Sequence, residues 1–217
     1  MSRYRWEPDA GISGRYRDTR TGRFVPAATV RRELDVYIDA SDDAARALTK
    51  ALRNRELSLA DWELAMRREI KRTHLNAIAL ERGGWSNLRP ADFGRAGQII
   101  REQYGYLRRF AQQIADGTQK LDGTLARRAE LYTAAGRNSW YRSKAANMTG
   151  KVTHQMSVRS ARDSCWQCRE LDRKVFRIDD ASFPLPGRRV CNHNCRCHLA
   201  YLTLGGDGES YETVEIA

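Results

Sequence analysis

All five cysteines of this 217-residue chain fall in one short segment near its C-terminal end. Two of them form a Cys-x2-Cys pair, and after a gap of 22 residues the other three follow as Cys-x3-Cys-x-Cys. A Cys-x2-Cys turn can present two thiolates to one tetrahedral zinc ion, and a second group brought back by a hairpin or loop would complete its four ligands. The predicted metal ligands are Cys165, Cys168, Cys191, Cys195 and Cys197.

The alternative for these cysteines is a pair of disulfides with one thiol left over. The odd count and the division into two short-range groups favour zinc instead. The start of the chain favours it too, because it has no apolar segment typical of a secretory signal. The spacing therefore predicts a structural Zn²⁺ site, since a sphere closed by thiolates leaves no position open for water.

The Cys-rich segment carries further motifs on both sides of its gap. It reads Asp163-Ser-Cys-Trp-Gln-Cys168, then Leu171-Asp-Arg-Lys-Val175, prolines at Pro184 and Pro186, and finally Asn194-Cys-Arg-Cys-His198. Over about residues 140 to 203 this pattern resembles the C-terminal module of the phage minor head proteins, the Mu F-like or head-morphogenesis family. The Asn-Cys-Arg-Cys ending is its most specific part.

The chain departs from the family pattern at two positions. Arg173 stands where the family has a Gly after Leu-Asp, and Asn192 stands where it has a His three residues before the first Cys of Cys-Arg-Cys. Cys191 lies beside the lost His and can replace it, because zinc accepts thiolate and imidazole at similar distances. His193 is the other candidate, so the fourth ligand stays open, with the Cys-x2-Cys cysteines as the firmest pair.

The resemblance implies a virion structural protein that is not an enzyme and has no catalytic residues. Proteins of this family sit inside the capsid in low copy, associate with the portal and contact packaged DNA. The implied partners are therefore phage portal or capsid proteins, together with double-stranded DNA bound without sequence specificity. The implied location is the virion, at the capsid interior or portal vertex, and the host cytoplasm during assembly.

The charge balance independently favours an anionic partner. Lys and Arg number 38 against 27 Asp and Glu, which gives a net charge of +11 and a pI of about 9.8. Nucleic acid is the commonest partner of such a surplus, and a basic surface that only confers solubility is the alternative. No stretch approaches 18 apolar residues, so neither a membrane span nor a membrane partner is expected.

Residues 1–28 are predicted to be an extended basic arm. Residues 15–25 alternate in the manner of a short hairpin with Thr21-Gly22 as its turn, and an isolated hairpin needs a partner surface to become ordered. The alternative is a flexible terminus. The arginines expected to contact DNA phosphates, or an acidic groove of another subunit, are Arg15, Arg17, Arg20 and Arg23.

The rest of the chain is predicted to be mainly α: a helical bundle over residues 29–150, followed by a small zinc-bound lobe of strands and loops over 151–204. Apolar residues at helical spacing predict four helices, and Phe93 opens the apolar face of the third. Their ranges are Thr29 to Leu52, Ser58 to Arg82, Pro90 to Asp116 and about Gly123 to Asn147.

The last residues, 205–217, are predicted to be an acidic, flexible tail. The stretch from Tyr211 to Ile216 alternates like a strand, so we expect it to add to the edge of a partner's sheet.

Two other functions compete with the virion role. The first is a zinc-stabilised DNA-binding protein without sequence specificity and without a capsid role, since no base-reading motif is present. The second is a zinc-dependent nuclease that uses Asp163, Asp172 or His154 near the Cys-rich segment. It is the weakest of the three, because the four histidines lie in no known hydrolase or deaminase motif.

Overall fold

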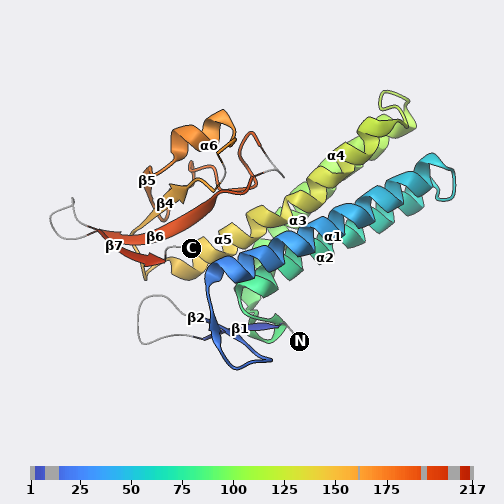
Figure 1. Ribbon diagram of the computed structural model, residues 1–217. Helices are drawn as coiled ribbons and strands as arrows, with labels where there is room; N and C mark the ends of the chain where they lie inside the picture. Colours follow the sequence, from blue (N-terminus) through green and yellow to red (C-terminus); the bar gives the residue numbers. More distant parts are fainter. Residues whose placement is uncertain (1–2, 8–14, 161, 192–194, 205–210, 216–217) are drawn as a thin grey trace.

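The computed structural model describes residues 3–7, 15–160, 162–191, 195–204 and 211–215 (Figure 1). The chain is mainly helical, as the sequence predicts. Five long helices run through its middle, and a small β-sheet lies on either side of the last of them (Figure 1). The long helices are α1 (Ala27–Arg53), α2 (Leu59–Glu81), α3 (Pro90–Ala115), α4 (Gly123–Ala134) and α5 (Gly136–Met148).

Helices α2 and α3 begin at signals in the sequence. The Ser58 side chain accepts a hydrogen bond from the Asp61 N–H at 3.1 Å at the start of α2. Helix α3 starts with Pro90 in its first turn, where the missing N–H costs nothing. Helix α1 begins at Ala27, two residues before the predicted Thr29.

The first four helices pack into a bundle whose core alternates aromatic and aliphatic side chains. The rings of Trp62 and Phe110 meet edge to face at 5.6 Å, and Phe110 stacks on Tyr132 at 6.1 Å. The apolar residues expected to face inward are buried or half-buried, in this core or in neighbouring apolar clusters, with the exception of Phe93, which is 48% exposed. Buried members of the core include Ala45, Leu52, Trp62, Met66, Ile70, Leu107, Phe110, Leu125 and Ala129.

The predicted fourth helix is interrupted at Ala135, where α4 ends and α5 begins. Gly136 lies against α2 there, and a Cβ atom added to it would come within 2.7 Å of the Thr73 Cγ2 atom. The absence of a side chain at Gly136 thus lets the two helices approach closely. The sequence pattern marked the apolar face of this segment but not its interruption.

Residues 15–25 form the predicted hairpin, with β2 (Arg15–Asp18), β3 (Phe24–Val25) and Gly22 in the turn at φ +68°. A further strand, β1 (Tyr4–Glu7), pairs with β2 and makes a three-stranded antiparallel sheet. The partner surface that orders this sheet belongs to the chain's own helices. Tyr16 is buried against them: its ring stacks on Trp140 and its hydroxyl donates to the Glu81 carbonyl at 2.8 Å.

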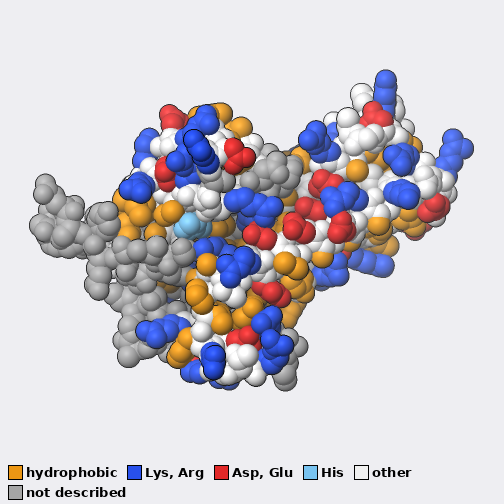
Figure 2. Space-filling view, in the orientation of Figure 1, with side chains coloured by type: hydrophobic (Ala, Val, Ile, Leu, Met, Phe, Trp, Pro, Cys, Tyr) orange, Lys and Arg blue, Asp and Glu red, His pale blue; other side chains and the backbone are white. Residues whose placement is uncertain are grey.

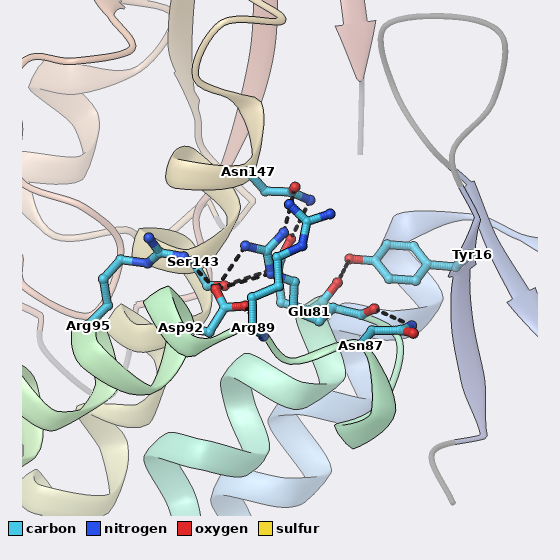
Figure 3. Close-up of polar contacts among 9 residues, drawn as sticks. Tyr16, Glu81, Asn87, Arg89, Asp92, Arg95, Ser143 and Asn147 are labelled. Carbon is cyan, nitrogen blue, oxygen red and sulfur yellow. Dashed lines mark hydrogen bonds and ion pairs between the residues drawn. The ribbon is translucent and has the colours of Figure 1, made fainter.

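A buried group of charges lies where α2, α3 and α5 meet, beside this sheet (Figure 3). The Arg82 guanidinium donates to the Asp92 carboxylate at 2.8 Å and to the Asn147 side chain at 2.6 Å. Burial alone would raise the pKa of Asp92, but the hydrogen bonds from Arg82 and from the Arg89 N–H outweigh it and hold that pKa below its usual range. This arrangement fixes the turn that joins α2 to α3.

Glu81 occupies the centre of the same group and is fully buried. Ser143 donates to its carboxylate at 2.7 Å, and Asn147 does so at 3.4 Å (Figure 3). Burial raises the pKa of Glu81, against the opposing effect of nearby Lys144. Because the Tyr16 hydroxyl is hydrogen-bonded to the Glu81 carbonyl, the buried charged group also holds the N-terminal sheet in place.

The C-terminal lobe is a four-stranded antiparallel sheet with one short helix. One of the strands expected for this lobe is Val175–Arg177, which follows the Leu171-Asp-Arg-Lys motif, whereas the sequence pattern did not locate the two central strands of the sheet. The sheet order is β5 (Val175–Arg177), β4 (His154–Val158), β6 (His198–Leu204) and β7 (Tyr211–Glu215), and the short helix is α6 (Trp166–Leu171).

Strand β7 corrects the expectation of a free tail. Residues 211–215 pair with β6 of the same chain, so this strand-like segment adds to the edge of its own sheet rather than to the sheet of a partner. A strand next to β6 gains main-chain hydrogen bonds without the entropy cost of association, which explains the preference. Residues 205–210 and 216–217 of the predicted tail lie outside the described residues.

One apolar core joins the two sheets and the helices. Val30 and Leu34 of α1 share it with Tyr16 of the N-terminal sheet and with Leu199 and Tyr201 of the C-terminal sheet. The Cys-rich lobe is therefore packed on the helical body rather than tethered to it. Within the described residues, none of the helices combines the length and the apolar character needed to cross a bilayer.

Candidate metal centre

The five cysteines come from two segments that the lobe brings together. Cys165 caps the start of α6 and Cys168 follows in its first turn, while Cys195 and Cys197 immediately precede β6. Cys191 lies in the loop between these groups. All five are free thiols, with no disulfide among them.

Neighbouring sulfur atoms of the cluster are spaced as two ligands of one ion would be. The Cys168 Sγ lies 3.5 Å from the Cys191 Sγ and 3.8 Å from the Cys195 Sγ. A tetrahedral zinc ion with bonds of about 2.3 Å places its sulfur ligands about 3.8 Å apart. The thiols form two sets of three, and within each set the sulfur atoms lie within 4.8 Å of one another. One set is Cys165, Cys168 and Cys191, and the other is Cys168, Cys195 and Cys197, so both contain Cys168. The cluster can therefore hold a metal ion.

Burial and the contacts between neighbouring thiols shift the pKa values of these cysteines. Burial raises the pKa of Cys168, and it raises that of Cys191 to about 12. Hydrogen bonding with Cys195 raises the pKa of Cys197. At Cys165 burial acts in the same direction, but hydrogen bonds from the Cys168 N–H and from neighbouring thiols outweigh it and lower the pKa. A divalent cation reverses this tendency, because a thiol that coordinates it is deprotonated.

Groups around the cluster hold its sulfur atoms in place. The Cys168 N–H donates to the Cys165 Sγ at 3.4 Å, which fixes the Cys-x2-Cys turn. The buried Arg189 side chain donates to the Cys168 Sγ at 3.6 Å and to the Pro184 carbonyl at 2.9 Å. Arg189 had no signal in the sequence, since Arg188-Arg189 looks like any exposed basic doublet.

The cluster is also tied to the helices. The Tyr141 hydroxyl of α5 donates to the Cys197 carbonyl at 3.1 Å. Asp35 of α1 forms an ion pair with Arg137 of α5 and lies 3.5 Å from the guanidinium of Arg196, which stands between two cysteines. The loop that carries Cys195 and Cys197 therefore contacts both α1 and α5.

The other residues proposed for this region do not converge. His193 lies outside the described residues. Asp163 lines the same hollow as the thiols. Asp172 accepts a hydrogen bond from the Arg159 N–H at 2.9 Å beyond one end of β4, whereas His154 lies at the other end. Five residues of extended chain separate these ends by roughly 16 Å, so the three candidate nuclease residues share no site.

The four arginines of the N-terminal sheet divide into two pairs. Arg15 and Arg17 both lie against the Phe24 ring, and Arg17 pairs with Glu7 at 2.9 Å. Arg20 and Arg23 are exposed in the turn. The turn itself is closed by Asp18, whose carboxylate accepts a hydrogen bond from the Arg20 N–H at 2.9 Å. Arg20 and Arg23 are thus the better placed pair for an external anion.

Many basic residues of the helices are neutralised within the chain. Arg67 pairs with Glu63 and Arg72 with Glu69, each on the same helix. Figure 2 shows Lys and Arg side chains interspersed with acidic ones over the helical body. The surplus of charge is therefore spread over the visible face rather than gathered into one basic stripe.

Comparison with known proteins adds no relative. The chain matches no protein-family model, no curated protein and no solved structure.

Proposed function

We propose that this chain is a structural protein of a bacteriophage virion, a minor head component that joins portal or capsid proteins to packaged DNA. The observation that carries the proposal is the convergence of the Cys-x2-Cys pair with the two cysteines of the Cys-Arg-Cys ending, which follows after 26 intervening residues. These are the motifs in which the chain resembles the phage minor head family, and they form a single cluster of thiols. Particles and, during assembly, the host cytoplasm are its proposed locations.

The metal in this proposal is one structural Zn²⁺ held by four of the five cysteines. Zinc prefers tetrahedral thiolate sites, and the sulfur spacing suits that geometry. A zinc ion enclosed by four thiolates supplies fixed coordination bonds and no open position for a reacting water. Its role would be to hold one loop against the helices. This loop carries Arg196, which pairs with Asp35, and Cys197, whose carbonyl accepts a hydrogen bond from Tyr141.

DNA binding without sequence specificity is the second part of the proposal. A net charge of +11 attracts a polyanion, and the exposed Arg20 and Arg23 can contact phosphates. Phosphate contacts position a protein on DNA without reading its sequence. The same observations suit a zinc-stabilised DNA-binding protein with no capsid role, which is the second candidate function.

Particle composition distinguishes the two candidates. The chain, produced by a phage that encodes it, should be found by mass spectrometry in purified particles and should crosslink to the portal or major capsid protein. A Cys168→Ser variant, which lacks the thiol shared by both sets, should be lost from particles, whereas a Ser86→Ala control at an exposed position away from the cluster should be retained. Absence of the wild-type chain from particles, together with DNA binding by the purified protein, would favour the second candidate.

A further inference from the structure

Arg189 is a basic residue in an unusual setting. Its side chain is only 1% exposed and is among the largest fully buried side chains of the molecule. The guanidinium lies 5.6 Å from the centre of the Phe183 ring. Its Nε donates to the Pro184 carbonyl at 2.9 Å, and its Nη1 donates to the Cys168 Sγ at 3.6 Å. The buried Nη2 has no hydrogen-bond partner in the described part of the chain.

A buried guanidinium requires an anion nearby. Arginine stays protonated in proteins, and an unpaired charge inside a protein is strongly destabilising. Among the described residues, no carboxylate forms an ion pair with Arg189. The Phe183 ring and one backbone carbonyl carry no net charge. The remaining neighbour is the cluster of thiols, and a neutral thiol is only a weak acceptor.

We propose that the cysteine cluster takes a soft divalent metal ion in an all-thiolate set of four, and that Arg189 is the built-in counter-cation of this anionic centre. Four thiolates and one divalent ion carry a net charge of −2, which supplies the negative charge that the buried guanidinium lacks. A site of three thiolates and one imidazole would carry −1, so the charge of Arg189 suits either set; the all-thiolate set follows from the five thiols gathered in the cluster. The inference rests on the proposed zinc site and specifies its ligand set and charge.

The position of Arg189 fits this role. Its sulfur partner, Cys168, is the one thiol that belongs to both sets of three, and four of the five possible choices of four thiols include it. A hydrogen bond to a metal-bound thiolate holds the sulfur in place and stabilises its charge. Arg196, the other arginine beside the cluster, is directed to Asp35 instead. Arg189 is thus a positioning residue that touches a ligand and not the metal.

The test compares two neighbouring arginines. Arg189→Met removes the buried charge but keeps a long apolar side chain, whereas Arg188→Met removes the same charge from a half-exposed residue that pairs with Glu102. Zinc affinity is measured for the full chain by competition with a chromophoric chelator. Arg189→Met should bind zinc about 10- to 100-fold more weakly than wild type, the usual cost of losing a neighbour of a metal ligand. Arg188→Met should match wild type, and Arg189→Lys should recover part of the affinity.

Cobalt substitution of the wild-type chain provides a measurement that does not depend on the folding of any variant. The intensity of the sulfur-to-Co²⁺ charge-transfer absorption reports the number of thiolate ligands, and four are expected. A spectrum of three thiolates, or equal zinc affinity of the Arg189→Met and Arg188→Met proteins, would overturn the inference while leaving the zinc site in place. A wild-type chain that binds no metal would overturn the zinc site itself.

Discussion

His74 is a fully buried imidazole between α2 and α5. Its Nδ1 atom lies 2.7 Å from the Ser139 Oγ atom, and its Nε2 atom has no partner among the described residues. Burial lowers the pKa of His74 to about 4, from an ordinary value of 6.5. The unfolded chain therefore binds a proton between these two pH values that the folded chain does not bind.

This difference predicts that acid destabilises the protein through His74. Stability from the neutral imidazole is fully present above pH 6.5 and is lost as the pH falls toward 4, by up to about 3 kcal/mol in all. Urea unfolding at a series of pH values should show this loss in wild type and a shallower pH dependence in a His74→Gln variant. Equal slopes in the two proteins would mean that His74 is accessible to protons in the folded state.

Arg189 illustrates what a residue-scale pattern cannot reveal. The cysteine spacing predicted the cluster because thiols at short separations have few other uses. Arg188 and Arg189 are identical in sequence terms, yet one is half-exposed and the other is buried against Cys168. Which of two adjacent arginines turns inward depends on the path of the loop, and that path is set by the tertiary contacts of the lobe.

At the scale of elements, the close contact of Gly136 with α2 predicts how a substitution there changes the stability of the fold. Alanine at Gly136 would place its Cβ atom 2.7 Å from the Thr73 Cγ2 atom, so Gly136→Ala should destabilise the fold by about 1–3 kcal/mol. Gly97 is the matched control, because it lies within α3 with nothing within 4 Å of the added Cβ atom. Gly97→Ala should stabilise by about 0.5–1 kcal/mol, since alanine is the better helix former.

Thermal and urea unfolding of the two variants measure this difference. If Gly136→Ala were as stable as Gly97→Ala, the junction of α4 and α5 would not lie tightly against α2.

The N-terminal hairpin allows the DNA proposal to be tested at one element. A double Arg20→Gln and Arg23→Gln variant should bind unrelated duplexes more weakly than wild type, and its log-log salt slope should be shallower by about 1.8, or 0.9 for each phosphate that is no longer neutralised. Arg17→Gln should change the slope less, because Arg17 already pairs with Glu7. Binding measured by fluorescence anisotropy at several salt concentrations tests this. An unchanged slope in the double variant would assign the charge surplus to another surface.

The helices were predictable from sequence because their apolar residues recur at helical spacing and their caps are explicit, as at Ser58 and Pro90. The pairing of strands that lie far apart in the sequence was not predictable in this way. Strand β6 pairs with β4 across some forty residues, and β7 returns to β6 instead of meeting another protein. The exposure of Phe93 was missed for a similar reason, since spacing gives the apolar face of a helix but not where its neighbours end.

For the whole molecule, the shared core links the candidate metal centre to the rest of the fold. Leu199 and Tyr201 follow directly after the Cys-Arg-Cys segment and pack in the same core as Val30, Leu34 and Trp140 of the helices. Tyr4 and Tyr16 of the N-terminal sheet belong to this core as well. Removing the metal is therefore expected to weaken the packing of α1 and α5 as well as the lobe, and deleting the N-terminal residues would disturb the same core.

The central claim is that the five cysteines form one metal centre, and native mass spectrometry of protein purified under reducing conditions tests it most directly. The expected mass is that of the chain plus one Zn²⁺ per molecule, and a Cys168→Ser variant should lack the metal. The fold should also become less stable on chelation, since structural zinc contributes apparent binding free energies of about 10–16 kcal/mol in small modules. A metal-free mass that remains after zinc is added back, or a mass that shows intact disulfides, would contradict the claim.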